Sequence, residues 1–418
     1  MGSYHSTLYN PIQNPLSFYI GKCKETALPD PTSTPRQLSV YQQVSTKLNE
    51  SFDPHATYWW QTSGRFLAGL LEDAGYTTSA QEKILTFFSR TITPFMGPAR
   101  ISAREPPQWR SFMTDDHYPI ELSWDFPTGR SAPRIRFSIE PLSVSAGTSM
   151  DPYNTDARSA FLEALLRALP NTDLETFRHF ERALIPRHAV SKEVLEEVQG
   201  HPSTIFYGFD LDNSEITTKA YFFPGLKAQQ TNCTNPEVVA RVIATAPQCS
   251  PNQLHALRTF NDFVREHDTA APNTPLEIDM LAIDLVAPTS SRVKIYFRTR
   301  ETSFSSVRQM MTLGQRLPAL NLHRLRLFWD VLLNQAGVPD ERHLPGSDTH
   351  RTAGLIYNVE LRWGSAAPKV KIYIPVRHYA DSDEVVLDAV HRYTGSASPD
   401  REIVEGAWGY ADTMRREL

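Results

Sequence analysis

A pair of strands followed by helices recurs along this sequence, and this repeat leaves few folds open to the chain. Alternating apolar and polar residues predict four antiparallel hairpins, and helical patterns with apolar residues at three- and four-residue spacing separate them. The predicted strand pairs are residues 119–125 with 134–140, 203–211 with 218–223, 276–286 with 292–298, and 355–363 with 369–374. Hairpins in series, each covered by helices on one face, can close into a barrel with the helices outside.

The rest of the chain fits one domain built around these hairpins. Helical periodicity covers residues 35–48, 58–74, 81–93, 154–169, 236–246, 251–267, 304–313, 322–336 and 382–393. The 418 residues exceed a typical domain, but a barrel can reach this length alone, so we expect a single α+β domain over residues 1–418. Residues 1–33 are rich in Pro, Ser, Thr and Asn and are expected to form an irregular N-terminal segment.

Composition excludes several classes of partner and compartment. The net charge of −5 speaks against general binding of nucleic acid or of anionic membranes, both of which need a basic surface. No stretch approaches the roughly 18 apolar residues of a membrane span, and the N-terminus lacks the pattern of a secretory signal. Three scattered cysteines suit a reducing compartment. We therefore expect a cytoplasmic protein.

One face of the predicted strands carries a repeated pair of cationic and phenolic side chains. The second strands of three hairpins read Lys219-Ala-Tyr221, Lys294-Ile-Tyr296 and Lys371-Ile-Tyr373, with the lysines 75 and then 77 positions apart. Side chains two positions apart share a face of a strand. Charged residues on such a face usually contact solvent. A solvated surface gives no reason to repeat the same pair in register, so we favour a shared interior.

Cations that converge in a barrel need an anion, because an unpaired buried charge is costly. A diphosphate fits, since Arg and Lys both bind phosphate oxygens, and tyrosine ring faces stabilise a carbocation. The sequence has no P-loop and no dinucleotide fingerprint. Asp115-Asp116 is followed by no second acidic pair at helical spacing. We therefore expect no metal and no cofactor, with Arg and Lys neutralising the leaving group.

Glu121 is the candidate acid on the same strand face as Ser123. An inward glutamate could accept the N–H of a heterocycle such as indole and take a proton as the ring is attacked. The alternative is a structural ion pair between Glu121 and a neighbouring arginine such as Arg136. Spacing alone leaves both readings open.

Five segments in order resemble the fungal dimethylallyltryptophan synthase family of aromatic prenyltransferases. They are Trp109–Trp124, Lys219–Pro224, Arg292–Tyr296, Met311–Gly314 and Lys369–Pro375. The resemblance runs from about Ser39 to the C-terminus. It implies an αββα prenyltransferase barrel, an antiparallel β-barrel inside a ring of helices. Members of the family have a final ββ unit that this sequence does not contain.

The resemblance also implies roles for individual residues. Glu121 would be the catalytic acid that binds the indole N–H. The diphosphate ligands would be Arg136, Lys219, Arg292, Lys294 and Lys371, although many relatives have Gln at the last position. The shield around the cation would be Tyr221, Tyr296 and Tyr373. No metal ligand is implied.

The implied activity is transfer of a dimethylallyl group from dimethylallyl diphosphate to an indole acceptor, without a metal. The Asp115-Asp116-His117 segment resembles members that act on tryptophan-containing cyclic dipeptides, although both aspartates could also cap a turn. Two alternatives stay open: a phenolic or polyketide acceptor, and a non-catalytic barrel that binds an isoprenoid or phosphorylated ligand. A homodimer is also left open.

Overall fold

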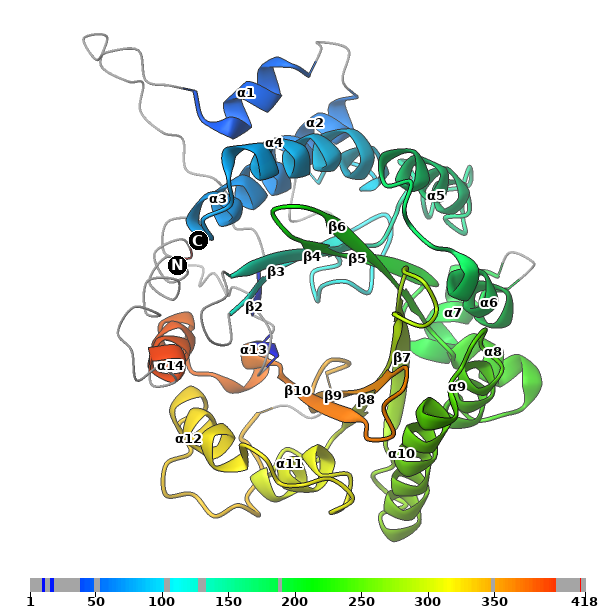
Figure 1. The fold of residues 1–418 in the computed structure, drawn as a ribbon, viewed down its shortest axis with the longest axis vertical. Coiled ribbons are helices and arrows are strands. Elements are labelled where there is room, and N and C mark those ends of the chain that lie inside the picture. The colour runs from blue at the N-terminus through cyan, green and yellow to red at the C-terminus, as the bar shows by residue number, and fades with distance from the viewer. Residues whose placement is uncertain are drawn as a thin grey trace.

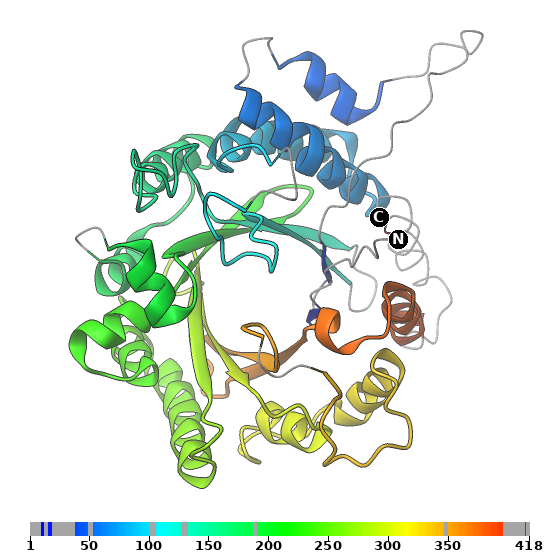
Figure 2. The same cartoon turned by 180° about the vertical axis from the view of Figure 1, so that it is seen from behind.

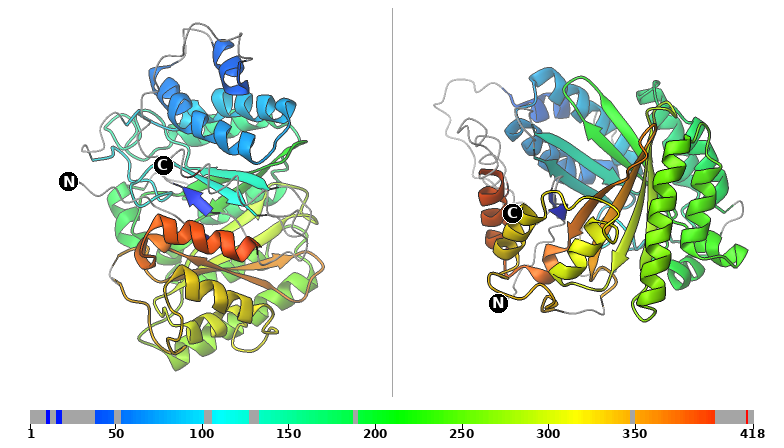
Figure 3. Two further views of the ribbon diagram at one scale, coloured as in Figure 1. Left: turned by 90° about the vertical axis from the view of Figure 1, so that its left-hand side faces the viewer. Right: turned by 60° about the horizontal axis from the view of Figure 1, so that its bottom comes forward.

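A strongly curled antiparallel sheet forms the centre of the molecule, and helices surround it (Figures 1 and 3). The computed structural model describes residues 10–11, 16–18, 38–48, 53–100, 106–126, 133–186, 190–346, 350–395 and 414. The sheet order is β1-β10-β9-β8-β7-β6-β5-β4-β3-β2, so strands consecutive in the chain are neighbours from β3 to β10. This is the arrangement expected when successive hairpins add to one growing sheet.

The four predicted hairpins are confirmed, with ends that differ by a few residues. Their strands are β3 Ile120–Asp125 with β4 Arg134–Ile139, β5 Ile205–Leu211 with β6 Ile216–Phe222, β7 Glu277–Asp284 with β8 Arg292–Thr299, and β9 Leu355–Arg362 with β10 Lys369–Ile374. Because the strands alternate in direction, all four hairpin turns lie at one end of the sheet. The helical connections lie at the other end.

Two short strands near the N-terminus complete the sheet. β1 (Asn10–Pro11) pairs with β10, and β2 (Leu16–Phe18) pairs with β3. β1 also contacts β2, which brings the two edges of the eight hairpin strands together. Residues 1–33 were expected to be irregular, and these strands correct that expectation for part of the segment. Strands of two and three residues are too short to leave a two-residue period in a sequence.

The helices follow the periodic stretches of the sequence. They are α1 Val40–Thr46, α2 Pro54–Trp59, η1 Trp60–Gly64, α3 Arg65–Asp73, α4 Thr78–Phe87, η2 Phe88–Ile92, η3 Thr93–Phe95, α5 Asp156–Ala168, α6 Glu175–Leu184, α7 Lys192–Gln199, α8 Gly225–Thr231, α9 Asn235–Ala244, α10 Pro251–Ala270, α11 Phe304–Met311, α12 Leu322–Leu332, α13 Val376–Tyr379 and α14 Asp383–Gly395. Reciprocal capping boxes at Thr234 and Ser250 fix the starts of α9 and α10. None of the helices in the described ranges combines the length and apolar character needed to cross a membrane.

Helices α6, α7, α8 and the one-turn α13 were absent from the predicted set. The buried residues Phe177, Phe180 and Leu184 of α6 follow three- and four-residue spacing, so the signal was present in the sequence. Many charged residues on the opposite face of α6 lowered its overall hydrophobicity. α7 and α8 are two-turn helices, which offer too few apolar positions for a period to stand out.

The main core lies between the helices and the outer face of the sheet. Aromatic residues of the strands pack directly against aromatic residues of the helices. The ring of Phe137 on β4 lies 5.4 Å from that of Phe88 in η2 and 4.7 Å from that of Phe209 on β5. Phe161 of α5 lies 5.0 Å from Tyr207 on β5. Since the apolar face of each strand points outward to the helices, the polar face points into the interior of the curled sheet.

Loops lie across the end of the sheet opposite the hairpin turns (Figure 2, cyan). The segment before β3 is held there by polar contacts. The backbone N–H of Phe112 donates to Ser203 Oγ at 2.9 Å, just before β5 begins. Gln108 Nε2 donates to the carbonyl oxygens of Val144 and Ala146, in the loop that follows β4. One end of the interior is thus covered by chain from two separate connections.

Candidate active site

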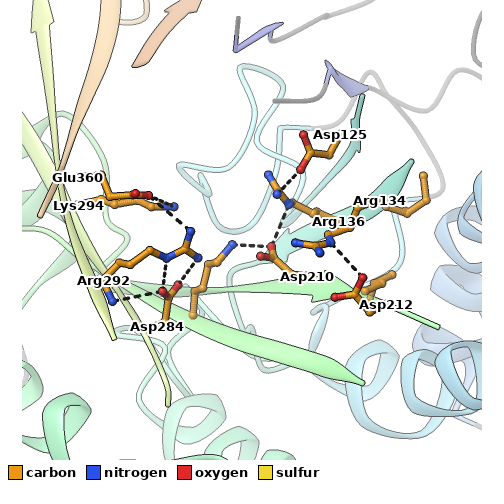
Figure 4. Close-up of polar contacts among 12 residues, drawn as sticks. Asp125, Arg134, Arg136, Asp210, Asp212, Asp284, Arg292, Lys294 and Glu360 are labelled. Atoms are coloured by element: carbon orange, nitrogen blue, oxygen red, sulfur yellow. Dashed lines mark hydrogen bonds and ion pairs between the residues drawn. The ribbon is translucent and has the colours of Figure 1, made fainter. Parts of the chain in front are cut away.

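The interior face nearest the hairpin turns carries a layer of charged side chains (Figure 4). Its cations include the five predicted ones, Arg136, Lys219, Arg292, Lys294 and Lys371. Arg362, which was not predicted, also belongs to it, with its Nε 2.6 Å from Glu360 Oε1. The relative exposure of Lys219 is 5% and that of Lys294 is 8%, so both lysines point into the interior. Four carboxylates complete this charged layer: Asp125, Asp210, Asp284 and Glu360.

Asp210 joins two of the cations. Its Oδ1 lies 2.5 Å from the Lys219 ammonium group and 3.0 Å from Arg136 Nε. Arg136 also forms an ion pair with Asp125 on β3. The strand register explains this convergence, because Arg136 on β4 lies directly opposite Asp210 on β5.

A second group of charges lies on β7, β8 and β9. Arg292 Nε lies 2.5 Å from Asp284 Oδ2, and Arg292 Nη2 lies 3.1 Å from Asp284 Oδ1, a bidentate pair across the β7–β8 hairpin. Glu360 lies 3.5 Å from Arg292 and 3.8 Å from Lys294. Lys371 on β10 lies close enough to Glu360, Arg136 and Asp125 for their charges to affect its pKa.

The four carboxylates were missed in the sequence analysis. Asp210, Asp284 and Glu360 lie on the first strands of their hairpins, each directly opposite a cation on the second strand of the preceding hairpin. The register within each hairpin could have identified them, because counting in steps of two from the turn places each acid on the same face as a predicted cation. The expectation that only a bound anion balances the cations is therefore incomplete.

Burial and neighbouring charge shift the protonation of this layer. Burial lowers the pKa of the Lys219 ammonium group, and burial together with Lys219 and Arg292 lowers that of Lys294 well below its ordinary value. Burial lowers the pKa of Lys371 to about 8. Burial alone would raise the pKa of Asp210, but Lys219 and Arg136 hold it below its ordinary range.

The three predicted tyrosines form the next layer, one step farther from the hairpin turns. The ring centroids of Tyr221 and Tyr296 are 6.0 Å apart, and those of Tyr296 and Tyr373 are 5.8 Å apart. Tyr221 also stacks on Phe206 at 4.2 Å. Burial raises the pKa of each of these phenols, so the tyrosine layer presents neutral rings to the interior.

Apolar side chains continue the interior beyond the tyrosine layer. Met113, Phe206 and Phe223 are buried together, with Phe112 and Met280 packed against them. Phe112 belongs to the loop that covers this end. The protein therefore offers a layered interior, charged near the hairpin turns, then phenolic, then apolar.

Glu121 lies on the interior face of β3, directly opposite Ser138. It is half-buried, and Ser123, two residues nearer the hairpin turn, lies opposite Arg136. Glu121 is therefore one step beyond the charged layer, on the side of the tyrosines. The structure thus places all nine predicted site residues on one interior face.

Glu140 is a fully buried carboxylate that holds the covering loop. It accepts hydrogen bonds from Trp109 Nε1 at 3.0 Å, Ser111 Oγ at 2.6 Å and Ser203 Oγ at 2.7 Å. Burial raises the pKa of Glu140, and these donors oppose the rise. Because Phe112 and Met113 follow Ser111, Glu140 fixes the segment that lines the apolar end of the interior.

Within the described ranges, one group of three potential metal ligands occurs, formed by Asp115, His350 and His378. Their ligand atoms lie within 4.8 Å of one another. The hydroxyl of Thr352 lies between them, 2.8 Å from His378 Nε2, 2.9 Å from His350 Nδ1 and 3.0 Å from Asp115 Oδ1. Arg377 also pairs with Asp115 at 3.6 Å. These hydrogen bonds occupy the ligand atoms, so the group links the loop before β3 to the loop before β9 and to α13.

A cavity of about 430 Å³ lies at the hairpin-turn end, bordered by Arg292 and Asp284. Arg362 and the hydroxyl groups of Thr217 and Ser291 also line it. The charged layer is therefore adjacent to an open space at this end.

The sequence matches known proteins along most of its length. Residues 55–401 match the sequence model of a family described as tryptophan dimethylallyltransferase. A 4-O-dimethylallyl-L-tyrosine synthase from Claviceps purpurea is 32% identical over 366 residues, which are 87% of this chain and 80% of that protein. A 7-dimethylallyltryptophan synthase from Aspergillus fumigatus is 31% identical over 375 residues, which are 86% of this chain and 78% of that protein.

A solved structure shares the fold. The crystal structure of NotF in complex with brevianamide F and DMSPP superimposes with a TM-score of 0.73 and 26% sequence identity, over 91% of this chain and 90% of that chain. The predicted αββα prenyltransferase barrel is thereby confirmed.

Replacement of Asp210 by Asn should destabilise the protein. The change leaves Lys219 buried without its nearest counter-charge, which typically costs about 3–5 kcal/mol. Urea unfolding measures the loss. Asp212→Asn is the matched control, because the Arg134–Asp212 pair is about 40% exposed (41% and 38%) and should contribute about 0–1 kcal/mol. Equal losses in the two variants would contradict the assigned importance of Asp210.

Lys371 should make diphosphate binding depend on pH. A bound diphosphate favours the charged ammonium form, so the affinity from Lys371 is present below its pKa of about 8 and is lost as the pH rises above it. In calorimetric titrations, the wild-type protein should bind inorganic pyrophosphate about tenfold more weakly at pH 9 than at pH 7, because Lys371 loses its charge over this range. Lys371→Gln should lack that loss, while titration of pyrophosphate itself affects both proteins alike. The same pH dependence in both would remove Lys371 from the site.

Proposed function

This chain belongs to the tryptophan dimethylallyltransferase family of aromatic prenyltransferases, and on that premise we propose that it transfers a dimethylallyl group from dimethylallyl diphosphate to an indole acceptor. The observation that carries the proposal is the layered interior. A buried charged layer lies directly beside a layer of tyrosine rings, and Glu121 lies on the same interior face. As the acceptor we propose a tryptophan-containing cyclic dipeptide.

The charged layer is suited to the leaving group. Arg136, Lys219, Arg292, Lys294 and Lys371 would bind the diphosphate oxygens and stabilise the negative charge that develops as the C–O bond breaks. Their carboxylate partners hold the cations in place, so little reorganisation accompanies the reaction. These side chains provide the positive charge that a metal ion would otherwise supply, and we propose a reaction that requires none.

The tyrosine layer is suited to the allylic cation. Lys219 and Tyr221 are two positions apart on β6, so a diphosphate on the lysine places its prenyl chain beside the tyrosine. The faces of Tyr221, Tyr296 and Tyr373 would stabilise the cation through the ring quadrupole. Tyr296 is buried and Tyr221 and Tyr373 are partly buried, so these rings would also limit the access of water.

The apolar end is suited to a flat acceptor. An indole packed near Phe206 and Met113 would lie beyond the tyrosines, with its N–H donated to Glu121. Its ring carbon attacks the allylic cation and forms the new C–C bond, and loss of a ring proton restores aromaticity. The products are the prenylated indole, diphosphate and a proton. Positioning of both reactants in one interior supplies much of the acceleration.

A phenolic acceptor is the second candidate. The relative named 4-O-dimethylallyl-L-tyrosine synthase supports it, because that name specifies a phenol oxygen and its sequence is 32% identical to this chain. The same charged and tyrosine layers would serve this reaction, and Glu121 would then accept the phenol proton.

Product analysis with a panel of acceptors tests the proposal. The protein is incubated with dimethylallyl diphosphate in EDTA, together with a tryptophan-containing diketopiperazine, tryptophan, tyrosine or a polyketide phenol, and products are identified by mass. We expect a product that has gained one dimethylallyl group from an indole acceptor. Products from phenols alone would favour the second candidate. Activity only after a divalent metal is restored would contradict the metal-independent reaction.

Replacement of Glu121 by Gln should lower kcat for an indole acceptor by on the order of 10²-fold, because the amide keeps the shape but accepts no proton. The KM for dimethylallyl diphosphate should stay near the wild-type value, since the charged layer is unchanged. Steady-state kinetics measure both. Glu215→Gln, an exposed position in the β5–β6 turn, is the matched control. Wild-type kcat in the Glu121 variant would rule out its catalytic role.

A further inference from the structure

Asn358 lies at the boundary between the charged layer and the tyrosine layer. On β9 it is directly opposite Tyr296 of β8 and directly opposite Lys371 of β10. Its relative exposure is 1%, and it is on the interior face of the sheet. Neither the sequence pattern nor the proposed mechanism has given this residue a role.

The side-chain amide of Asn358 binds the tyrosine hydroxyls. Its Nδ2 donates to the hydroxyl of Tyr373 at 2.7 Å. Tyr296 lies directly opposite Asn358 on the neighbouring strand, and its ring centroid is 5.8 Å from that of Tyr373. Asn358 is therefore hydrogen-bonded to one ring of the tyrosine layer and lies beside a second ring.

The amide oxygen of Asn358 has no hydrogen-bond partner among the described residues. A buried acceptor without a donor is unfavourable, and an apolar side chain of similar size would avoid the loss. Unsatisfied buried groups of this kind are uncommon and call for an explanation. The hydrogen bond of the Nδ2 group explains the asparagine, since a leucine at this position would leave the hydroxyl of Tyr373 without its amide donor.

We propose that Asn358 is a positioning residue, whose amide orients the rings of Tyr296 and Tyr373 so that their faces, not their edges, line the space where the allylic cation forms. A ring face is the negative part of the quadrupole and the edge is the positive part, so orientation decides whether a tyrosine stabilises the cation. This role rests on the proposed prenyl transfer, and it adds to that mechanism a residue that determines the orientation of the tyrosine rings.

The consequence of losing this amide is a change in the fate of the cation. Rings that turn would stabilise the cation less and admit water. Water would then attack the cation in place of the acceptor, forming a C–O bond and giving dimethylallyl alcohol and a proton. Diphosphate binding would be little changed, because Asn358 is not an ion-pair partner of the cations described above.

The variant Asn358→Leu tests the proposal in the full-length protein, with dimethylallyl diphosphate and the best acceptor of the panel. We expect kcat to fall about ten- to a hundredfold, the donor KM to stay within about twofold, and the ratio of dimethylallyl alcohol to prenylated product to rise severalfold. Thr218→Val is the matched control. It removes a buried hydroxyl that also lacks a hydrogen-bond partner, but on the outer face of β6, and it should leave kcat and the product ratio unchanged.

A double-mutant comparison provides a second readout. Tyr373→Phe removes the hydroxyl that Asn358 binds, so it should raise the alcohol share by itself, and adding Asn358→Leu should raise it by less than in the wild-type background. If Asn358→Leu does not fold, Asn358→Ser replaces it in both comparisons. A wild-type product ratio in the Asn358 variant, or independent effects in the double mutant, overturns the inference. A wild-type protein that forms neither prenylated product nor alcohol overturns the proposed function, and the inference with it.

Discussion

Charge placed inside a barrel must be balanced inside the barrel, and this requirement organises the interior of the protein. Lys219 and Lys294 are buried, as are Asp210, Asp284 and Glu360. Each lysine lies near at least one of these acids, and the two predicted arginines of the layer pair with carboxylates on adjacent strands. An ion pair of this kind contributes little net stability, but loss of one partner is costly. The arrangement therefore fixes cation positions more than it stabilises the fold.

The same balance of charges affects how the layer would bind an anion. Burial lowers the pKa of Lys294 well below its ordinary value and that of Lys371 to about 8, so the charge of the layer depends on pH. A diphosphate that enters such a layer makes the charged forms of both lysines more favourable. Donor binding and proton uptake are then linked.

Much of this arrangement could be predicted from the sequence, and the exceptions have physical reasons. The Lys-x-Tyr repeat identified the interior face, because a two-residue period specifies which side chains share a face. It did not identify Asp210 or Glu360, because their importance depends on pairing with cations on the neighbouring hairpin and not on a repeat along one strand. Glu140 and Asn358 were missed because each acts through contacts with residues distant in sequence. The strands β1 and β2 were missed because they are too short to show a period.

The alternation of the strands also determines where this chain can change in length. In β8, Lys294 and Tyr296 face the interior while Ile295 and Phe297 pack under the helices. One extra residue within that strand would exchange the two faces beyond the insertion point, and would place lysine and tyrosine in an aromatic core and isoleucine beside the carboxylates. An extra residue in a hairpin turn lies outside the paired region and has no such effect. Evolutionary variation in length is therefore expected to collect in the turns, while the strands keep an invariant count of residues between successive cations and rings.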